Sequence, residues 1–425
     1  MLSREDNETL CRVGPETPMG KTFRRFWHPV ATSDQIARRD SDPLRVRLLG
    51  ESLVVFRDTD GRVGVLEELC MHRGSSLAIG RVEGGGIRCL FHGWKFAADG
   101  TILETPNHSD CRLRERLKAP AFPVKEEGGL IWTYLGPADK VPPFRRFAFM
   151  DAAPEHRTVI RVNVKANYLQ LCEGGVDSSH VGVLHSNMAR PGWMNNTFEA
   201  NPDTTNPAAL AVDDNAPALE MEDTGYGFHY AAYRHDSAGK ICNIRVVPFM
   251  LPYIRIIPAP AQHYTVFETP DNDESTSTFI VIHGREPVDR QHIFALLGLN
   301  KATIYDAASC NFVANWQDRF GQDRPGMRDS WTGLGGVEYE DAVVALSPGP
   351  ILDRSKEHLV PADQAVVRMR HLLLQSARKV VAGGDPLGIE LSDLRRVSAS
   401  ADVPLQGRWQ DAAAAHFILP EQEPA

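Results

Sequence analysis

Short hydrophobic runs separated by polar turns dominate the first third of the chain. Residues 52–56 and 63–66 flank the sequence DTDG at 58–61, and a second Asp-Gly pair at 99–100 separates two further short runs. Runs of this length joined by Asp-Gly turns are typical of β-hairpins. We therefore expect a small all-β domain between about residues 44 and 135.

The pattern changes after the proline-rich segment GPADKVPPF, which cannot continue a central strand or a helix interior. Longer apolar stretches follow and predict strands of an antiparallel sheet at 157–164, 227–233, 242–257 and 276–283. The fold class expected is therefore α+β, an all-β domain followed by a domain of antiparallel sheet and helices. The boundaries expected are 1–26 for an N-terminal segment, 27–140 for the first domain and 141–425 for the second.

Helical periodicity is confined to the second domain. Residues 167–184 have a mixed helical pattern. Between residues 362 and 381 apolar side chains recur at helical spacing, and Gly383-Gly384 follows as a stop signal. We expect a helix over 362–381.

Composition narrows the class of protein. The chain has 425 residues, 42% hydrophobic and 24% charged, and a net charge of −9, which disfavours a nucleic-acid-binding protein. No apolar run approaches the roughly 20 residues that a membrane helix needs. The N-terminal sequence MLSREDNETL lacks the apolar core of a secretory signal, so we expect a cytoplasmic protein without a membrane span.

Two loops each offer one thiolate and one imidazole. Cys70 and His72 form C-x-H, and Cys89 and His92 form C-x-x-H after sixteen intervening residues. A Rieske [2Fe-2S] cluster has two cysteines on one iron and two histidines on the other, so each loop can supply one ligand to each iron. A zinc site is the alternative, although zinc fingers more usually group like ligands.

A second group of candidate site residues is Asp177, His180 and His185, of which the two histidines are candidate ligands of one metal. Two histidines and one carboxylate on one face of Fe(II) leave positions open for O₂ chemistry. Five residues correspond to about 500° around a helix, so the two histidines share no helix face. A helix end or a π-bulge near Gly182 is required if both are to reach one metal.

The segment CMHRGSSLAIGRVEGGGIRCLFHGWKF resembles the Rieske domains of ring-hydroxylating oxygenases, apart from Phe91, where relatives commonly have tyrosine. The second constellation resembles the mononuclear iron site of the same family and follows the Rieske motif in the same order. The N-terminal 29 residues and GPILDRSKEHL look like the phthalate 4,5-dioxygenase and phenoxybenzoate dioxygenase branch. The sequence itself holds no G-x-G-x-x-G after a strand and no second cluster motif, which indicates that electrons come through a separate protein.

This resemblance implies a terminal oxygenase component with two cofactors, a Rieske [2Fe-2S] cluster and Fe(II). Electrons from NADH would arrive through a separate reductase, and oxygen from O₂ would enter an aromatic, carboxylated substrate. O-demethylation of methoxylated aromatic acids on the same scaffold is the neighbouring activity. A zinc hydrolase and a Rieske electron carrier are the two alternatives from other classes.

The third iron ligand should be a downstream carboxylate, and Asp318, Asp323, Asp341 and Asp353 are candidates. We choose Asp341, because the family branch places its iron aspartate ahead of a GPI-type segment. The resemblance also implies that Asp177 bridges an iron histidine of one subunit to a Rieske histidine, His72 or His92, of its neighbour. The expected assembly is a head-to-tail homotrimer or a pair of trimers.

Arginines in apolar surroundings are candidates for binding a substrate carboxylate. Arg245 lies in an apolar strand, and Arg190 follows His185 closely. For Arg255, in a similar strand, we expect the solvent face of the sheet.

Overall fold

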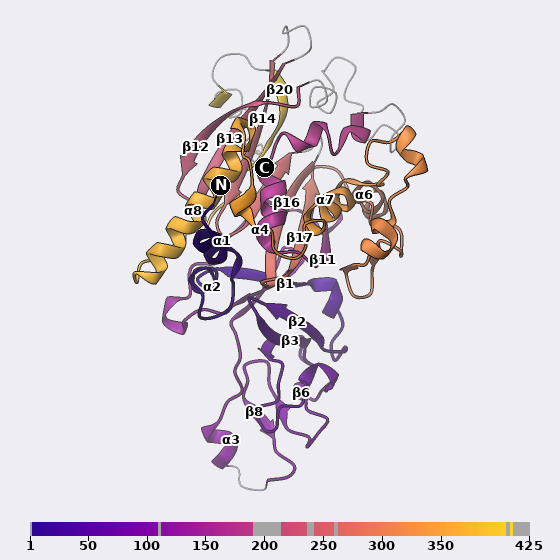
Figure 1. The fold of residues 1–425 in the computed structure, drawn as a ribbon. Helices are drawn as coiled ribbons and strands as arrows, with labels where there is room; N and C mark the ends of the chain where they lie inside the picture. Colours follow the sequence, from indigo (N-terminus) through magenta and orange to yellow (C-terminus); the bar gives the residue numbers. More distant parts are fainter. Residues whose placement is uncertain are drawn as a thin grey trace, which may run out of the picture.

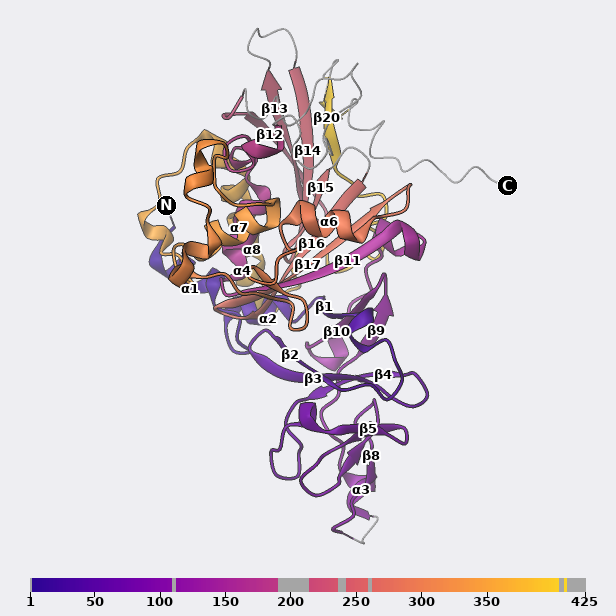
Figure 2. The same ribbon diagram turned by 90° about the vertical axis from the view of Figure 1, so that its right-hand side faces the viewer.

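The computed structural model describes residues 2–108, 112–189, 214–235, 242–258, 262–404 and 409–410. A small β-rich part lies below a larger part in which helices lie against a long sheet (Figure 1). A view turned by 90° shows the same division along the chain (Figure 2). The α+β fold expected from the sequence is confirmed.

The smaller part consists of three antiparallel sheets. The first has the order β1-β10-β9, with β1 (Trp27–Thr32), β9 (Val124–Glu127) and β10 (Leu130–Tyr134). The second contains β2 (Leu44–Leu48), β3 (Glu51–Arg57) and β4 (Val63–Glu67). The third contains β5 (Arg81–Glu83), β6 (Gly86–Arg88), β7 (Lys95–Phe96) and β8 (Ile102–Glu104), with the short helix α3 (Arg112–Arg116) nearby. Both predicted hairpins form, β3 with β4 and β7 with β8.

One ten-stranded sheet forms the larger part, in the order β12-β13-β14-β15-β16-β17-β11-β19-β18, with β20 beside β14. Its long strands are β11 (Arg157–Val164), β12 (Ala218–Thr224), β13 (Gly227–His235), β14 (Cys242–Met250), β15 (Ile254–Pro258), β16 (Gln262–Asn272) and β17 (Ser275–Gly284). Its short strands are β18 (Tyr305–Asp306), β19 (Asn311–Phe312) and β20 (Ser400–Pro404).

One predicted strand is divided in two. The sequence predicts a single strand over 242–257, whereas a turn at residues 251–253 separates β14 from β15, which then pair antiparallel. Pro252 lies in this turn and has no N–H to donate to a ladder, which explains why the apolar pattern continues while the strand does not.

The helices of the larger part pack against its sheet and against one another. They are α1 (Arg4–Cys11), α2 (Pro18–Phe23), α4 (Tyr168–Val176), α6 (Arg290–Leu297), α7 (Val337–Leu346) and α8 (Gln364–Val381). Helix α8 forms where the sequence predicts it and contacts α1 and α2, while α4 contacts β16 and α7. No helix in the described ranges is both long enough and apolar enough to cross a membrane.

Candidate metal centres and active site

The second constellation lies where α4 ends. Asn167 caps the start of α4, and its side-chain oxygen accepts a hydrogen bond from the Leu169 N–H at 3.1 Å. The helix ends at Val176, and Asp177 has extended backbone angles. His180 then begins a single 3₁₀ turn, η6 (His180–Gly182). The helix end therefore lies before both histidines rather than near Gly182, which frees each imidazole from helical spacing.

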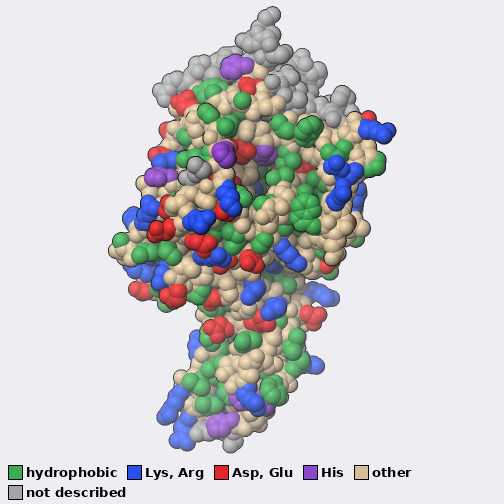
Figure 3. Space-filling view, viewed as in Figure 1, with side chains coloured by type: hydrophobic (Ala, Val, Ile, Leu, Met, Phe, Trp, Pro, Cys, Tyr) green, Lys and Arg blue, Asp and Glu red, His purple; other side chains and the backbone are tan. Residues whose placement is uncertain are grey.

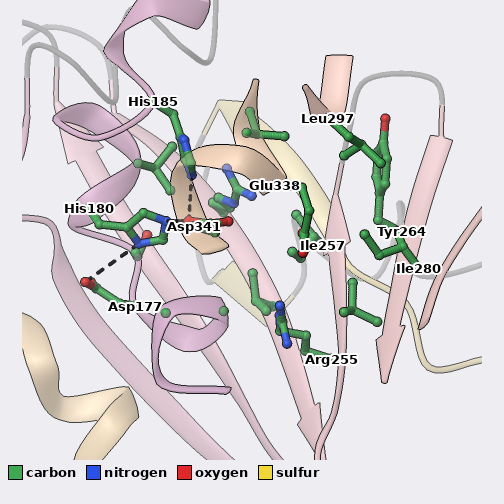
Figure 4. A pocket seen from close by; sticks show the side chains of 18 of the residues that line it. Asp177, His180, His185, Arg255, Ile257, Tyr264, Ile280, Leu297, Glu338 and Asp341 are labelled. Carbon is green, nitrogen blue, oxygen red and sulfur yellow. Dashed lines mark ion pairs between the residues drawn. The ribbon is translucent and has the colours of Figure 1, made fainter. Parts of the chain in front are cut away.

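His180, His185 and Asp341 come together at this point (Figure 4). One ligand atom from each residue lies within 4.8 Å of the other two. The Nε2 atoms of His180 and His185 are 3.7 and 3.2 Å from Asp341 Oδ1. Ligand atoms bound to one metal at about 2.1 Å and at right angles lie about 3 Å apart, so the three residues could hold one metal ion.

Each histidine has a carboxylate on its other nitrogen. His185 Nδ1 is 2.7 Å from Glu340 Oε2, a hydrogen bond that leaves the Nε2 lone pair free for a metal. His180 Nδ1 is 3.7 Å from Asp177 Oδ2. Asp177 is itself held by Ser179, whose N–H and hydroxyl donate to Oδ1 at 2.7 and 2.8 Å. The His185 imidazole is thus oriented as metal ligands usually are, whereas Asp177 lies beside His180 at a distance longer than a hydrogen bond.

Neighbouring charges shift the pKa values of His185 and Asp341. Burial by itself would lower the pKa of His185, but the carboxylates of Asp341 and Glu340 raise it to about 10. Burial would raise the pKa of Asp341, yet His185 and His180 lower it. The adjacent carboxylates of Glu340 and Asp341 lie beside the buried His185 and attract a cation, and a divalent metal would balance their negative charge.

The other carboxylates considered as iron ligands have local roles. Asp318 accepts a hydrogen bond from the Asn315 N–H, Asp323 from the Gly326 N–H, and Asp353 from the Ser355 N–H and hydroxyl. None of these three belongs to the metal-binding group found among the described residues.

A cavity of about 150 Å³ adjoins the three residues. We call it the apolar cavity, because most of its wall is hydrophobic, including Val181, Val247, Ile257, Ile280, Leu296 and Leu297. Arg245 and Arg255 also line it, whereas Arg190 lies outside the described residues. A space-filling view shows histidine and acidic side chains gathered beside a hollow in the larger part (Figure 3).

The expectation that Arg255 faces solvent is wrong. Its side chain is 7% exposed and forms an ion pair with Glu268 at 2.7 Å. The guanidinium lies against α4, where a Cβ on Gly175 would be 1.8 Å from Arg255 Nε. Because glycine has no Cβ, position 175 leaves space for the buried guanidinium of Arg255.

The first constellation lies in two loops of the smaller part, Cys70 and His72 between β4 and β5, and Cys89 and His92 between β6 and β7. Cys70 and Cys89 are 3% exposed and belong to a separate hydrophobic core. The rings of His72 and His92 are 4.6 Å apart, and Trp94 stacks on His72 at 4.7 Å. The two loops are closed by backbone hydrogen bonds, from Gly74 to Cys70 at 2.8 Å and from Gly93 to Cys89 at 3.1 Å.

These residues fit an iron–sulfur cluster. Burial raises the pKa of the Cys70 thiol to about 11, so the thiolate form needs positively charged iron beside it. Burial and the neighbouring His92 and Arg73 lower the pKa of His72, which favours the neutral form that binds metal. His92 Nδ1 is buried without a hydrogen-bond partner among the described residues, as expected for an atom reserved for a ligand.

The chain thus has a small β domain with two Cys-His loops and a larger domain with two histidines and a carboxylate beside a cavity. This combination is characteristic of Rieske-type oxygenases. Residues 26–123 match the Rieske [2Fe-2S] domain, and residues 133–420 match the family described as LigXa C-terminal domain like. The chain belongs to this family of Rieske oxygenase subunits. Its cofactors are a Rieske [2Fe-2S] cluster and mononuclear Fe(II).

Similar proteins have the same organisation. The chain is 34% identical to the phthalate 4,5-dioxygenase oxygenase subunit of Pseudomonas putida, over 91% of this chain and 89% of the relative. It is 30% identical to the phenoxybenzoate dioxygenase subunit alpha of Ectopseudomonas oleovorans, over 90% and 88%. The terminal oxygenase of carbazole 1,9a-dioxygenase from Novosphingobium sp. KA1 shares the fold, with a TM-score of 0.57, 19% identity and coverage of 88% and 96%. The predicted resemblance is confirmed, and the chain is an oxygenase component of a multicomponent system.

Sequence reasoning missed two carboxylates at the site. Glu340 is 2% exposed, contacts His185 and accepts a hydrogen bond from the Thr332 hydroxyl at 2.5 Å. Glu338 is 8% exposed and lines the apolar cavity. Their position beside Asp341 in the sequence VEYED was the available signal, but only the helix shows which way each side chain points.

Proposed function

We propose that Fe(II) binds to His180, His185 and Asp341, and that the Rieske cluster binds to Cys70, His72, Cys89 and His92. The observation that carries the first assignment is the meeting of three ligand atoms within 4.8 Å, each imidazole backed by a carboxylate. The bound iron supplies O₂ activation. The cluster supplies electrons one at a time.

The site supports insertion of oxygen into an aromatic carboxylate. The apolar cavity suits an aromatic ring, and Arg245 on β14 offers a charge at its wall. Because Glu268 already neutralises Arg255, we assign the substrate carboxylate to Arg245. Relatives named for phthalate and phenoxybenzoate support this substrate class.

The electrons are proposed to come from NADH through a separate reductase. The decisive experiment supplies the purified protein with NADH, a compatible reductase and a panel of aromatic acids, including phthalate, 3-chlorobenzoate and methoxybenzoates. We expect substrate-dependent O₂ uptake and a hydroxylated or O-demethylated product. A protein that contains zinc and no acid-labile sulfide, or that consumes O₂ without forming product from any acid, contradicts the proposal.

A trimer would join the two metal centres across subunits. Within one chain they lie in different parts, with β2, β3 and β4 between the cluster sheet and the larger domain (Figure 2). The two Cys-His loops and η2 (Leu77–Ile79) carry exposed apolar side chains, which we call the Rieske rim: Leu69, Met71, Ile79, Leu90 and Phe91. Exposed Val183, which lies between His180 and His185 in the sequence, offers an apolar counterpart.

Asp177 lies at the proposed junction between subunits, 23% exposed and 3.7 Å from His180. We infer that it links His180 to a Rieske histidine of a neighbouring copy. Asp177→Asn should keep both metal centres and the trimer, measured by metal analysis and light scattering, yet slow electron transfer to the iron in single turnovers. A wild-type transfer rate in this variant would contradict the bridging role.

A further inference from the structure

A second cavity, of about 190 Å³, adjoins the iron site, and Asp177, His180 and Asp341 line it as they line the apolar cavity. We call it the acidic cavity, because five carboxylates line it: Glu173, Asp177, Glu268, Glu338 and Asp341. Val344, which is 52% exposed, is also part of its wall, so the cavity reaches the protein surface. Arg255 and Glu338 line both cavities.

Glu338 lies between the two cavities. It is one turn before Asp341 on α7, and its side chain points into the space between Asp341, Arg255 and Ile257 (Figure 4). Glu338 therefore lines both the cavity proposed to hold the substrate and the cavity that reaches the surface.

Burial favours a protonated Glu338. Arg255 forms its ion pair with Glu268 at 2.7 Å, so one buried cation faces two buried carboxylates. An ionised carboxylate that is 8% exposed and has no cation of its own is strongly disfavoured. Burial raises the pKa of Glu338 well above its usual range, and Glu268 and Asp341 raise it further, against the opposing effects of Arg255 and His185.

The reaction needs protons, and the described phenols and arginines of the apolar cavity are poor donors. Insertion of one oxygen atom takes up O₂, two electrons and two protons and yields the hydroxylated product and water. Dihydroxylation takes up the same electrons and protons. Burial raises the pKa of the lining phenols Tyr230 and Tyr264 to about 12, and an arginine does not release its proton.

We propose that Glu338 is the proton donor of this oxygenase and is reprotonated from solvent through the acidic cavity. The O–H bond of its carboxyl group breaks, the proton goes to the oxygen that the two electrons from the reductase reduce, and water in the acidic cavity returns a proton to the carboxylate. This inference rests on the iron site proposed above.

Infrared difference spectroscopy of the iron-loaded protein tests the protonation state without substrate. A protonated carboxyl group has a C=O stretch apart from that of a carboxylate, and it shifts in D₂O. We expect Glu338→Gln to lose one such band at neutral pH. The matched control Glu222→Gln changes an exposed acid on β12 and should lose none. An unchanged band in Glu338→Gln overturns the proposal.

Turnover with an aromatic acid that yields product tests the donor role. When it is fully loaded with iron, the Glu338→Gln variant should turn over about 100-fold more slowly with O₂ and should release hydrogen peroxide. The Glu338→Asp variant, which keeps a carboxyl group, should retain part of the wild-type rate. Hydrogen peroxide already contains two electrons and two protons, so peroxide-driven single turnovers should reach the wild-type yield. Equal losses with O₂ and peroxide, or no loss at all, refute the role. If no acid yields product with the wild type, the proposed substrate class fails, while the infrared result still decides the state of Glu338.

Discussion

Arg354 should be one of the most important residues for the stability of the larger domain. It lies in GPILDRSKEHL, is 0% exposed, and donates to both oxygens of Glu173 at 2.7 and 2.8 Å. Arg370 donates to the same carboxylate at 2.6 Å and forms two further bonds with Glu357, at 2.7 and 2.8 Å. Two arginines and two glutamates thus connect α4 to α8 and to η11 (Arg354–Lys356).

Arg354→Met keeps much of the side-chain volume and removes the charge. Removing one partner of a buried ion pair costs about 3–5 kcal/mol. Because Arg370 still contacts Glu173, we expect the lower limit, about 3 kcal/mol. For a domain of this size that corresponds to a fall in the melting temperature of roughly 6–12 °C.

Thermal unfolding followed by circular dichroism measures the effect. Arg378→Met is the matched control, since Arg378 is 66% exposed and pairs with Asp6 at 2.8 Å. An exposed pair contributes about 0–1 kcal/mol, so the control should melt within a few degrees of the wild type. Equal shifts in the two variants would show that the buried cluster contributes no more than a surface pair and would refute the reasoning.

Three further changes test other parts of the molecule. Cys89→Ser should abolish the Rieske electron paramagnetic resonance signal while near-ultraviolet circular dichroism shows the larger domain still folded; a retained signal contradicts the ligand assignment. Glu340→Gln should weaken Fe(II) binding about 10–100-fold, measured by metal titration, because His185 loses its carboxylate partner. Burial lowers the pKa of His28 to about 3, and its ring contacts Tyr253 and the Phe23 carbonyl, so the unfolded chain binds a proton below about pH 6.5 that the folded chain does not. Stability should therefore fall by about 2 kcal/mol between pH 6.5 and 5, and His28→Asn should reduce this slope in urea unfolding.

Local signals were sufficient for the Rieske motif and for most strands. Cys70, His72, Cys89 and His92 are close in sequence, and each loop closes through its own backbone hydrogen bonds. Hairpin turns and apolar alternation likewise depend on neighbouring residues, and β11 spans 157–164 as predicted. Such features need no knowledge of the tertiary structure.

The positions of Asp341 and Arg255 depend on long-range packing, which the sequence alone does not show. Asp341 reaches His185 only because α7 packs beside α4, and the resemblance to a family, rather than spacing, selected it from four acids. Arg255 was assigned to solvent because a strand alone does not show that a helix covers its outer side. The missing information is the contact with Gly175, which the fold creates.

Helix α7 places three carboxylates in three environments within two turns. Glu338 and Asp341 are three residues apart, so they share the side that faces the cavities, whereas Glu340 points to His185 and Thr332. Small displacements of α7 would therefore disturb the proposed ligand, its partner and the proposed proton donor together. Gly336 directly precedes α7, and a Cβ there would be 2.2 Å from the backbone nitrogen of Gly298 at the end of α6. This close approach of Gly298 and Gly336 fixes the start of α7, so the glycine pair helps to position the carboxylates of the active site.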